Sequence, residues 1–600
     1  MHVRTNASAH PEDLSTPLPA DVNLRPGGLP DPRRPGLYVK QLQQFQERWS
    51  GDAGGASGSS GLAGSGGAAT VPRGGGLGEH SGSFGDPELS RSSLSIWPRG
   101  TLTAVVLGGG ESDSRRLFPL TQYRTLPALP FGGAYRIIDL LMSNMLNSGI
   151  NKIHILTAYN SYSLNRHLQR TYDMSGGVPY GGDGYIEVVA NSMSPESHQW
   201  VTGTAGCVRQ FMTYFDSNSK NRFIEDIMIL PGDHVYSADY TPIIAYHRST
   251  GADLTIVCRP VSGEQASRLG VVKLDGQNRI KTFAEKPSAA ELPELAMSDD
   301  EMRPFMTPTE EALRTRRRQQ TTLASRNGSG PMGRLSPGAS KGGARMGGGG
   351  GGRVVLDTMT SVDETEMRPG SSGYVGSCGI YIFRRSVLSE ALKRHFKMQD
   401  FGRQIIPELI REGAKVHAYR LPGYWADVGG SVGDFYSANM ALLCDPPSIS
   451  FNAPINSPFF KFPLTIPASQ MMHSRVSGAL VSAGCIINKS NIRNSVIGSR
   501  SIIGPNVTIE DSVVFGASHY DHEKPLPRPL GPTFPPMGVG ENSIVRSAIL
   551  DLNVRVGKNV QLLNKEGVYE SADRGVQGMY IRDGIIVLSR ETVVPDGTVM

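Results

Sequence analysis

The sequence has few cysteines and no long apolar segment. Its five cysteines are scattered over 600 residues without a close pair, a pattern that fits neither a disulfide framework nor a zinc site. No apolar run approaches the roughly 20 residues that a membrane-spanning helix needs. The first residues include Glu12 and Asp13 and no apolar core, so we expect no secretory signal. They also make a poor transit peptide, because transit peptides contain few acidic residues.

Charge of one sign is not in excess either. The chain has 60 Lys and Arg against 55 Asp and Glu, and its formal net charge of +5 is small for its length. Several arginines fall together in one glycine-rich segment, at positions 314 and 316–318. We therefore predict that the protein binds neither nucleic acid nor a membrane.

Glycine and proline are abundant instead. Many of the 72 glycines and 41 prolines lie in two stretches: residues 1–98, rich in Gly and Ser, and residues 302–352, rich in Arg, Gly and Ser. Such compositions bury too little apolar surface to offset the entropy of the chain. We predict a disordered N-terminal region at 1–98, which is a candidate targeting segment, and a disordered insertion at 302–352.

Apolar runs alternate with helix-like polar segments in the middle of the chain. The apolar runs lie at residues 103–107, 152–156, 227–230, 254–257 and 379–383. This alternation is typical of a doubly wound, Rossmann-like α/β domain, which binds its ligands at the carboxyl ends of the strands. We predict that this domain spans residues 99–445 and that the insertion interrupts it.

The last part of the chain has a different period. Apolar residues recur about every six positions, with small residues, Gly or Asn between them. They are Ile486, Ile492, Ile497, Ile503 and Ile509, and then Ile544, Leu550, Val556, Leu562 and Val568. A spacing of six is typical of a parallel β-helix, whose apolar anchors stack inside three short, flat sides. We predict a linker at 446–475 and a β-helix at 476–600.

Residues suited to phosphate chemistry follow the first predicted strand. Gly108, Gly109 and Gly110 form a turn, and Arg116 comes soon after it. Backbone N–H groups in a glycine-rich turn can bind a triphosphate, and a nearby arginine can neutralise its charge. Three glycines after a strand are a weak signal alone, so the interpretation depends on the segments around them.

Those segments resemble the sugar nucleotidyltransferases, and in particular ADP-glucose pyrophosphorylase (glucose-1-phosphate adenylyltransferase). The similar segments lie at residues 108–110, 116–121, 124–130, 135–139, 160–168, 203–205, 232–234, 284–287, 377–383, 400–402 and 424–429. The resemblance covers residues 101–600 except the insertion. It implies an α/β Rossmann-like nucleotidyltransferase domain followed by a C-terminal left-handed parallel β-helix.

The resemblance also implies a reaction and roles for individual residues. A phosphate oxygen of α-D-glucose 1-phosphate would attack the α-phosphorus of ATP, giving ADP-glucose and diphosphate in starch or glycogen synthesis. Asp233 and Asp427 would be catalytic residues that hold a Mg²⁺ cofactor. The other implied roles are nucleotide binding by Gly108, Gly109, Gly110 and Arg116, catalysis by Arg116 and Lys286, and glucose 1-phosphate binding by Gly270, Glu285, Lys286 and Ser377.

Several positions on the ATP side depart from the family pattern. Residues 111–115 separate the glycines from Arg116 where the family has three residues, and Glu111 and Asp113 place negative charge near the triphosphate. One misplaced charge at a distance of four ångströms costs about 1 to 4 kcal/mol. Leu126 stands where catalytic subunits have lysine. The other departures are Ser192, Met193, Val201, Gly206 and Arg268, and the set predicts reduced or absent turnover.

Four segments, at residues 124–127, 147–152, 580–585 and 596–600, look most like the regulatory large subunit of the plant and algal enzyme. This similarity implies a heterotetramer with a catalytic small subunit, control by 3-phosphoglycerate and phosphate, and location in the plastid or chloroplast stroma. The family binds these effectors between its domains, through cations of the β-helix region, and Arg590 stands at one such position.

Other interpretations stay open. One is a non-catalytic subunit that senses a sugar phosphate, and another is a fully active adenylyltransferase whose altered loop still closes on ATP. A guanylyl- or thymidylyltransferase fits the segments at 135–139 and 160–168 less well. A β-helix alone would also fit a hexapeptide-type acyltransferase, but nothing in it supplies a catalytic histidine between coils.

Overall fold

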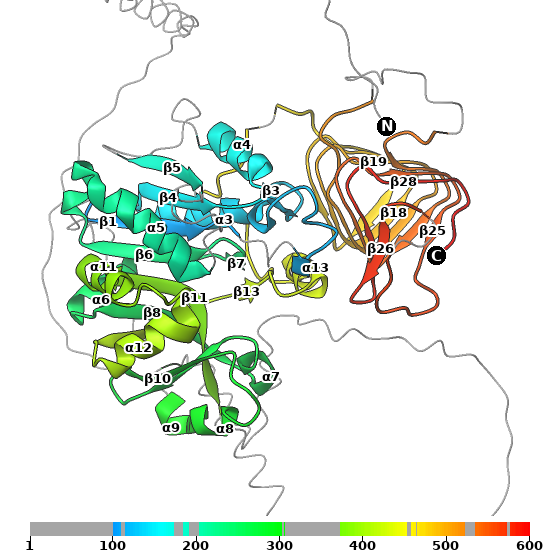
Figure 1. Cartoon of the computed structure of the whole chain (residues 1–600). Helices are drawn as coiled ribbons and strands as arrows, with labels where there is room; N and C mark the ends of the chain where they lie inside the picture. Colours follow the sequence, from blue (N-terminus) through cyan, green and yellow to red (C-terminus); the bar gives the residue numbers. More distant parts are fainter. Residues whose placement is uncertain are drawn as a thin grey trace, which may run out of the picture. The chain divides into compact units, whose positions relative to one another are not determined.

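A computed structural model describes residues 100–109, 115–172, 184–190, 203–302, 305, 373–452, 458–463, 465–521, 534–572 and 576–600 (Figure 1). The predicted disordered region at 1–98 and most of the predicted insertion at 302–352 lie outside these residues. No helix in these ranges is both long and apolar enough to cross a membrane.

The first described domain is built on one large mixed β-sheet. Its strands are β1 (Leu102–Leu107), β4 (Lys152–Thr157), β5 (Tyr185–Ala190), β6 (Asp226–Pro231), β8 (Leu254–Val261), β9 (Gly270–Leu274), β10 (Ile280–Glu285), β11 (Tyr374–Arg384) and β12 (Val416–Arg420). The order runs β10-β9-β11-β6-β1-β4-β5, and β8 joins β11 to β12. Strands β6, β1, β4 and β5 are parallel, whereas β11 runs antiparallel to β6.

Helices cover both faces of this sheet. They are α3 (Ile137–Asn147), α4 (Tyr162–Thr171), α5 (Thr204–Ser217), α6 (Thr241–Ser249), α11 (Arg385–Arg394) and α12 (Ile406–Arg411). The shorter helical segments are η1 (Leu126–Ala128), η3 (Ser219–Phe223), α7 (Gly263–Ala266), α8 (Leu292–Leu295), α9 (Asp299–Met302), η5 (Phe401–Ile405), α13 (Val432–Met440) and η6 (Ala441–Leu443). Helices α5, α11 and α12 pack on one face and α3, α4 and α6 on the other.

The two covered faces explain why the strands are mostly apolar and why the polar residues within them, such as Thr103 and His154, are buried. In β1, Val105 belongs to the core under α5, while its neighbours Ala104 and Val106 belong to the core under α3. Side chains alternate between faces along a strand, so a sheet buried on both sides favours apolar residues at every position. All five strands predicted from such runs are confirmed, as β1, β4, β6, β8 and β11.

Two short ribbons extend the domain at the carboxyl edge of the parallel strands. One pairs β7 (His234–Tyr236) with β13 (Trp425–Asp427), and the other pairs β2 (Pro130–Phe131) with β3 (Tyr135–Arg136). Because β7 follows β6 after a two-residue turn, the β7–β13 pair brings a segment from late in the domain to the end of a central strand.

The second domain is a parallel β-helix, as predicted. One side stacks β14 (Gln470–Met472), β17 (Ile486–Asn488), β19 (Ile502–Ile503), β21 (Gly538–Val539), β24 (Arg555–Val556) and β28 (Val593–Val594). The other strands are β15 (Arg475–Ser477), β16 (Leu480–Val481), β18 (Asn491–Ile497), β20 (Thr508–Val514), β22 (Ile544–Arg546), β23 (Ala548–Leu550), β25 (Gln561–Leu562), β26 (Met579–Arg582) and β27 (Ile585–Leu588).

Asparagines turn the corners of the coils. Asn506, Asn542 and Asn559 all have positive φ, at 58°, 60° and 56°. Asparagine tolerates this left-handed conformation better than most residues. Their side-chain amides also hydrogen-bond from coil to coil, at 3.2 Å and 3.3 Å. The asparagines between the apolar anchors therefore form a ladder that holds successive coils in register.

The six-residue period locates most of the anchors but not all of them. Seven of the ten predicted anchors are at most 2% exposed, but Ile486 and Ile544 are half-buried, and their neighbours Ile487 and Val545 are fully buried instead. Val568 is also only partly buried. Paired positions on adjacent coils, such as Ile492 and Ile509, lie seventeen residues apart rather than eighteen. Counting strictly in sixes therefore gradually selects positions whose side chains point out of the β-helix instead of into its core.

Two predicted boundaries need correction. Met302 and Phe305, assigned to the insertion, are 0% and 1% exposed and belong to the core under α5. Strand β14 begins at Gln470, within the predicted linker, so the β-helix starts upstream of residue 476. Met302 and Phe305 have charged and glycine-rich neighbours, so the sequence around them does not indicate a core. The side chains of β14 are exposed, so the first coil lacks the apolar anchors that indicate a β-helix.

The α/β domain and the β-helix share one apolar cluster, which we call the shared core. The α/β domain contributes Leu117, Leu120, Leu126, Leu129 and Phe131, among others, and the β-helix contributes Val496, Val513, Phe515, Ile549, Ile585 and Val587. Tyr436 of α13 also donates a hydrogen bond to the Asp511 carbonyl at 2.7 Å. Because water is excluded from this cluster, the two domains stabilise each other.

Candidate active site

The glycine turn after β1 is tightly packed. The Gly108 N–H donates to the Leu156 carbonyl at 2.8 Å, and a Cβ at Gly108 would lie 2.7 Å from that oxygen. Gly109 has φ of +95°, which disfavours any other residue. Gly110 lies outside the described residues, as do Glu111 and Asp113, and Arg116 is exposed. The turn thus leaves the carboxyl end of β1 without side chains, as close approach of a ligand requires.

Asp233 and Asp427 meet at the same edge of the sheet. Asp233 follows β6, and Asp427 ends β13, which pairs with β7 so that Asp427 lies opposite His234. Ligand atoms of Asp233, His234 and Asp427 all lie within 4.8 Å of one another. A Cβ at Gly429 would lie 2.5 Å from Asp233 Oδ2 and 3.3 Å from Asp427 Oδ1, so any side chain at position 429 would displace the Asp233 carboxylate. The two carboxylates fit a hard divalent cation such as Mg²⁺.

His234 lies beside the two carboxylates and was not singled out from the sequence. Its Nε2 is 3.6 Å from Asp233 Oδ1 and 3.9 Å from Asp427 Oδ1. Its Nδ1 is buried and has no hydrogen-bond partner within the described ranges. Its ring stands edge-on to Trp425 at 4.9 Å. The histidine directly follows Asp233 in the sequence, and that adjacency was the available signal.

The residues predicted to bind glucose 1-phosphate cluster on a neighbouring hairpin. Gly270 begins β9 and pairs with Glu285 at the end of β10. A Cβ at Gly270 would lie 2.8 Å from Glu285 Oε2, and one at Gly402 would lie 2.6 Å from it. Lys286 follows with φ of +53°, and its N–H donates to the Leu269 carbonyl at 2.9 Å. Two glycines thus make room for one carboxylate, beside a lysine held by its backbone.

Burial raises the pKa of Glu285 above its ordinary value. The nearby carboxylate of Asp400 acts in the same direction, whereas the charges of Lys286 and Arg403 oppose it. Asp400 caps η5 by accepting from the Arg403 N–H at 2.8 Å. The Glu285 carboxylate is therefore poorly hydrated and lies near two cations. Such a group can gain hydrogen bonds from ligand hydroxyls without giving up many bonds to water.

Ser377 lies between the two groups of residues. It is 5% exposed, and its Oγ accepts from the Gly379 N–H at 3.1 Å. A Cβ at Gly379 would lie 3.2 Å from His234 Cε1. Strand β11 thus connects the hairpin residues to the carboxylate pair.

The departures from the family pattern have different structural settings. Leu126 is 1% exposed and belongs to the shared core. The ring of its neighbour Pro127 lies 3.5 Å and 3.0 Å from where a Cβ would stand at Gly109 and Gly232, so η1 lies directly under the glycine turn. The Gly206 N–H donates to the Gln399 carbonyl at 3.3 Å. Ser192, Met193 and Val201 lie outside the described residues.

The two segments at 135–139 and 160–168 form a buried structural network. Asp139 is 0% exposed and accepts from the Arg136 N–H at 2.8 Å and from Tyr172 Oη at 2.8 Å. His167 Nε2 lies 2.6 Å from the same carboxylate. Arg136 Nη1 donates to Ser163 Oγ at 3.0 Å. These residues hold α3 against α4, and they position Arg136.

Arg590, the predicted effector residue, lies among other arginines. Burial lowers the pKa of Arg136 to about 10, with the charges of Arg124 and Arg590 adding to the effect and that of Asp139 opposing it. Arg590 is 37% exposed and pairs with Glu591 at 3.1 Å. Arg124 of the α/β domain and Arg590 of the β-helix thus both add positive charge near Arg136, although Arg124 is itself paired with Asp551.

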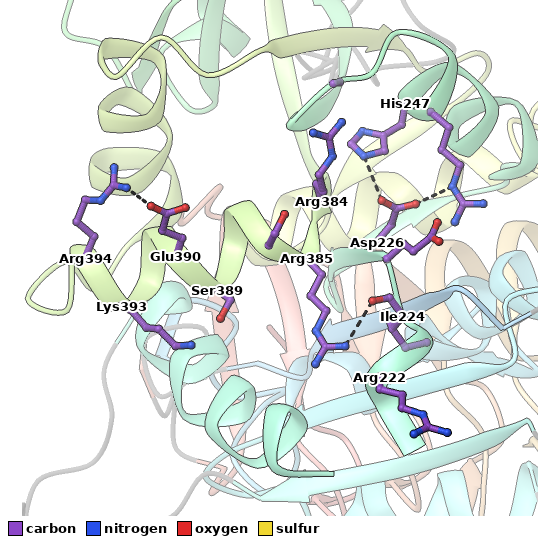
Figure 2. A pocket seen from close by; sticks show the side chains of 14 residues that line it. Arg222, Ile224, Asp226, His247, Arg384, Arg385, Ser389, Glu390, Lys393 and Arg394 are labelled. Atoms are coloured by element: carbon purple, nitrogen blue, oxygen red, sulfur yellow. Dashed lines mark hydrogen bonds and ion pairs between the residues drawn. The ribbon is translucent and has the colours of Figure 1, made fainter. Parts of the chain in front are cut away.

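A cavity of about 1030 Å³ lies elsewhere, at the opposite end of β6, and contains none of the predicted site residues (Figure 2). Most of its arginines already have carboxylate partners. The pairs are Arg248 with Asp226, Arg384 with Asp253, Arg385 with Asp216, and Arg394 with Glu390. These pairs join α6 to β6, β11 to the residue before β8, and α11 to α5, and the last lies within α11, so most of the positive charge lining the cavity is neutralised.

Comparison with known families agrees with this architecture. The model of the nucleotidyl transferase family matches residues 103–444. That of the GLGC left-handed parallel β-helix domain matches residues 465–599. The two matches coincide with the two described domains, including strand β14 upstream of the predicted start. The chain therefore belongs to the nucleotidyl transferase family and has the domain pairing of an ADP-glucose pyrophosphorylase-like protein.

Proposed function

We propose that this protein is a subunit of a glucose-1-phosphate adenylyltransferase, which forms ADP-glucose and diphosphate from ATP and α-D-glucose 1-phosphate. The observation that carries the proposal is the meeting of Asp233 and Asp427 at the end of β6. This pair lies at the carboxyl edge of the parallel strands, beside the glycine turn, where α/β domains bind nucleotides.

The reaction requires two anions to be held together while negative charge builds on the α-phosphate. Mg²⁺ bound by Asp233 and Asp427 would neutralise phosphate charge and act as a Lewis acid. The chain itself supplies orientation: the Gly429 N–H donates to Asp427 Oδ1 at 2.8 Å, and the Val428 N–H donates to the Asp233 carbonyl at 3.2 Å. The first bond orients the Asp427 carboxylate, and the second ties the backbone of Asp233 to the same loop, before any ligand arrives.

The β9–β10 hairpin supplies the sugar-binding groups. Glu285 would accept hydrogen bonds from glucose hydroxyls, and Lys286 would place a point charge against the sugar phosphate. The backbone at Gly270 and the hydroxyl of Ser377 would complete the pocket. The contact of Gly379 with His234 keeps this group beside the carboxylate pair, so that the phosphate can face the α-phosphorus.

We further propose that the chain is a regulatory large-subunit type with reduced turnover, assembled with a catalytic small subunit in the plastid. Leu126 supports this proposal, because its side chain is buried in the shared core and supplies no positive charge to the glycine turn. Arg590 would bind 3-phosphoglycerate or phosphate between the domains, with the charge of Arg136 nearby.

The direct test is ADP-glucose formation from ATP, glucose 1-phosphate and Mg²⁺, by the purified chain alone and after co-expression with a catalytic small subunit. No product alone, with altered 3-phosphoglycerate dependence in the complex, supports a regulatory subunit. Robust turnover alone that Asp233→Ala abolishes identifies a fully active enzyme instead. Arg590→Ala should weaken the response of the complex to phosphate, and an unchanged response contradicts the effector site.

The second candidate is a non-catalytic sensor of sugar phosphate, favoured by the intact hairpin group beside an altered nucleotide loop. Calorimetry with glucose 1-phosphate alone separates the two. The sensor is supported if the chain binds glucose 1-phosphate and Glu285→Gln weakens this binding. The chain must then neither bind ATP nor change the activity of a partner subunit through Arg590.

A further inference from the structure

One antiparallel hairpin interrupts the parallel order of the β-helix. Strands β26 and β27 pair antiparallel, with Arg582 opposite Ile585. The two residues between them, Asp583 and Gly584, both have positive φ, at 52° and 76°. Positive φ at both central positions is the mark of a type I′ turn, which favours Asp-Gly and closes the tightest hairpins. The turn therefore presents Asp583 on a rigid support.

The carboxylate of Asp583 contacts the α/β domain. Its Oδ2 accepts from the Gly433 N–H at 2.7 Å, in the first turn of α13. Its Oδ1 accepts from Tyr569 Oη at 3.2 Å, so both oxygens are oriented. Backbone N–H groups in the first turn of a helix have no partner within the helix, and a carboxylate there also interacts well with the helix dipole. The β-helix thus supplies a cap for a helix of the other domain.

That helix begins just after the carboxylate pair. Only residues 428–431 separate Asp427 from α13, and Ser431 caps the helix by accepting from the Asp434 N–H at 3.2 Å. Within this short segment, Gly429 has no spare room against Asp233 and Asp427. The N–H groups of Val428 and Gly429 in this segment donate to the Asp233 carbonyl and to Asp427 Oδ1, so a shift of the start of α13 moves the backbone bonded to both residues.

The same hairpin touches the nucleotide side. The ring of Tyr580 in β26 packs edge-on against Phe118 at 5.2 Å, and the Arg582 guanidinium lies 5.7 Å from the same ring. Phe118 follows Arg116 by two residues. The hairpin thus contacts both segments that flank the glycine turn and the carboxylate pair.

We propose that Asp583 is a positioning residue, through which the β-helix holds the loop of Asp427 in the geometry that binds the metal ion. The inference rests on the proposed function, which assigns Asp233 and Asp427 to Mg²⁺. Asp583 touches neither substrate nor metal, and it acts by fixing Gly433 and hence the start of α13.

Binding of Mn²⁺, a paramagnetic substitute for Mg²⁺, tests this role by electron paramagnetic resonance on the full chain. Asp583→Ala should weaken Mn²⁺ binding about 3- to 10-fold, the loss expected for one helix cap. Asp583→Asn keeps an acceptor for the Gly433 N–H and should stay within about twofold of the wild type. Asp596→Ala is the matched control, because Asp596 accepts from the Lys558 N–H at 2.8 Å inside the β-helix.

Unchanged Mn²⁺ binding in Asp583→Ala, or an equal loss in Asp596→Ala, overturns the proposal. Should Asp583→Ala not fold, Tyr569→Phe replaces it, since Tyr569 is 67% exposed and its hydroxyl orients Asp583. Tyr569→Phe should weaken Mn²⁺ binding about twofold. Unchanged Mn²⁺ binding in this variant would then overturn the proposal. A wild type that binds Mn²⁺ through Asp233 but forms no ADP-glucose alone and does not change the activity or the 3-phosphoglycerate dependence of a catalytic small subunit refutes the proposed function, and the Mn²⁺ comparison still decides the role of Asp583.

Discussion

Replacing Asp551 with alanine removes the carboxylate that pairs with Arg124 across the two domains. Arg124 Nη2 lies 2.5 Å from Asp551 Oδ2, and the side chains are 4% and 2% exposed. Asp551 Oδ1 also accepts from the Leu552 N–H at 2.6 Å. Arg124 lies 5.7 Å from the ring of Phe515 in the shared core, and its Nε has no partner within the described ranges. The variant would therefore leave a buried guanidinium without its counter-charge.

The expected loss is large for one substitution. Removing one partner of a buried ion pair costs about 3 to 5 kcal/mol, because the remaining charge stays desolvated. Replacing both partners with apolar residues of similar size often costs little. Asp551→Ala should therefore lower the free energy of unfolding by about 3 to 5 kcal/mol, and adding Arg124→Met to it should restore much of the loss.

Urea denaturation followed by circular dichroism measures both variants. Glu541→Ala is the control, because Glu541 pairs with Lys558 at 2.7 Å on the surface, where both side chains are well exposed. Exposed pairs contribute little to stability, so this variant should unfold nearly like the wild type. If Asp551→Ala unfolds like Glu541→Ala, or if Arg124→Met brings no recovery, the reasoning about the buried pair is wrong.

Three further predictions concern single side chains. Glu285→Gln should raise the melting temperature at pH 8. Burial raises the pKa of the Glu285 carboxyl, so its charged form destabilises the folded protein at high pH. The gain should vanish as the pH falls below 4.5, where the carboxyl is protonated in the folded and the unfolded protein. Burial lowers the pKa of His154 from 6.5 to about 4. Neutral His154 is tolerated above pH 6.5, but protonating the buried ring as the pH falls toward 4 lowers the free energy of unfolding, by about 2 kcal/mol at pH 5. In denaturant melts, His154→Gln should therefore show a weaker dependence of stability on pH. Gly429→Ala would put a Cβ 2.5 Å from Asp233 Oδ2. It should weaken Mn²⁺ binding by this chain about 10- to 100-fold with an unchanged melting temperature, and unchanged Mn²⁺ binding would contradict the tight loop.

The sequence predicts the sheet well because burial on both faces leaves a local signal. Residues 103–107 are apolar apart from Thr103, and residues 152–156 contain Lys152 and His154, which are themselves buried; both segments form inner strands of the sheet. The β-helix was also visible, since stacking requires a repeat. The register of the coils could not be predicted, because each coil has sixteen or seventeen residues and not the eighteen that three sides of six residues would give.

The resemblance to the family, and not a local pattern, points to Asp233, Asp427 and the hairpin residues, and it assigns no role to His234. Asp233 lies next to His234 in the sequence, and Glu285 next to Lys286. The pairing of β7 with β13 joins segments of three residues that are far apart in the chain, and such short strands carry no pattern of their own. The cap from Asp583 to Gly433 joins two different domains across a long separation in the chain. Contacts of this kind depend on the tertiary fold and leave no periodic trace.

The shared core limits how this protein can be recombined. A chimaera that grafts another β-helix onto residues 99–445 must reproduce the side chains that face Leu117, Leu126 and Phe131, and must also supply a carboxylate for Arg124. A poor match would expose a contiguous apolar patch, which favours aggregation over folding. Substitutions at Val513, Phe515 or Ile549 would have to be matched by changes in the α/β domain, so the two halves of the chain are expected to evolve together.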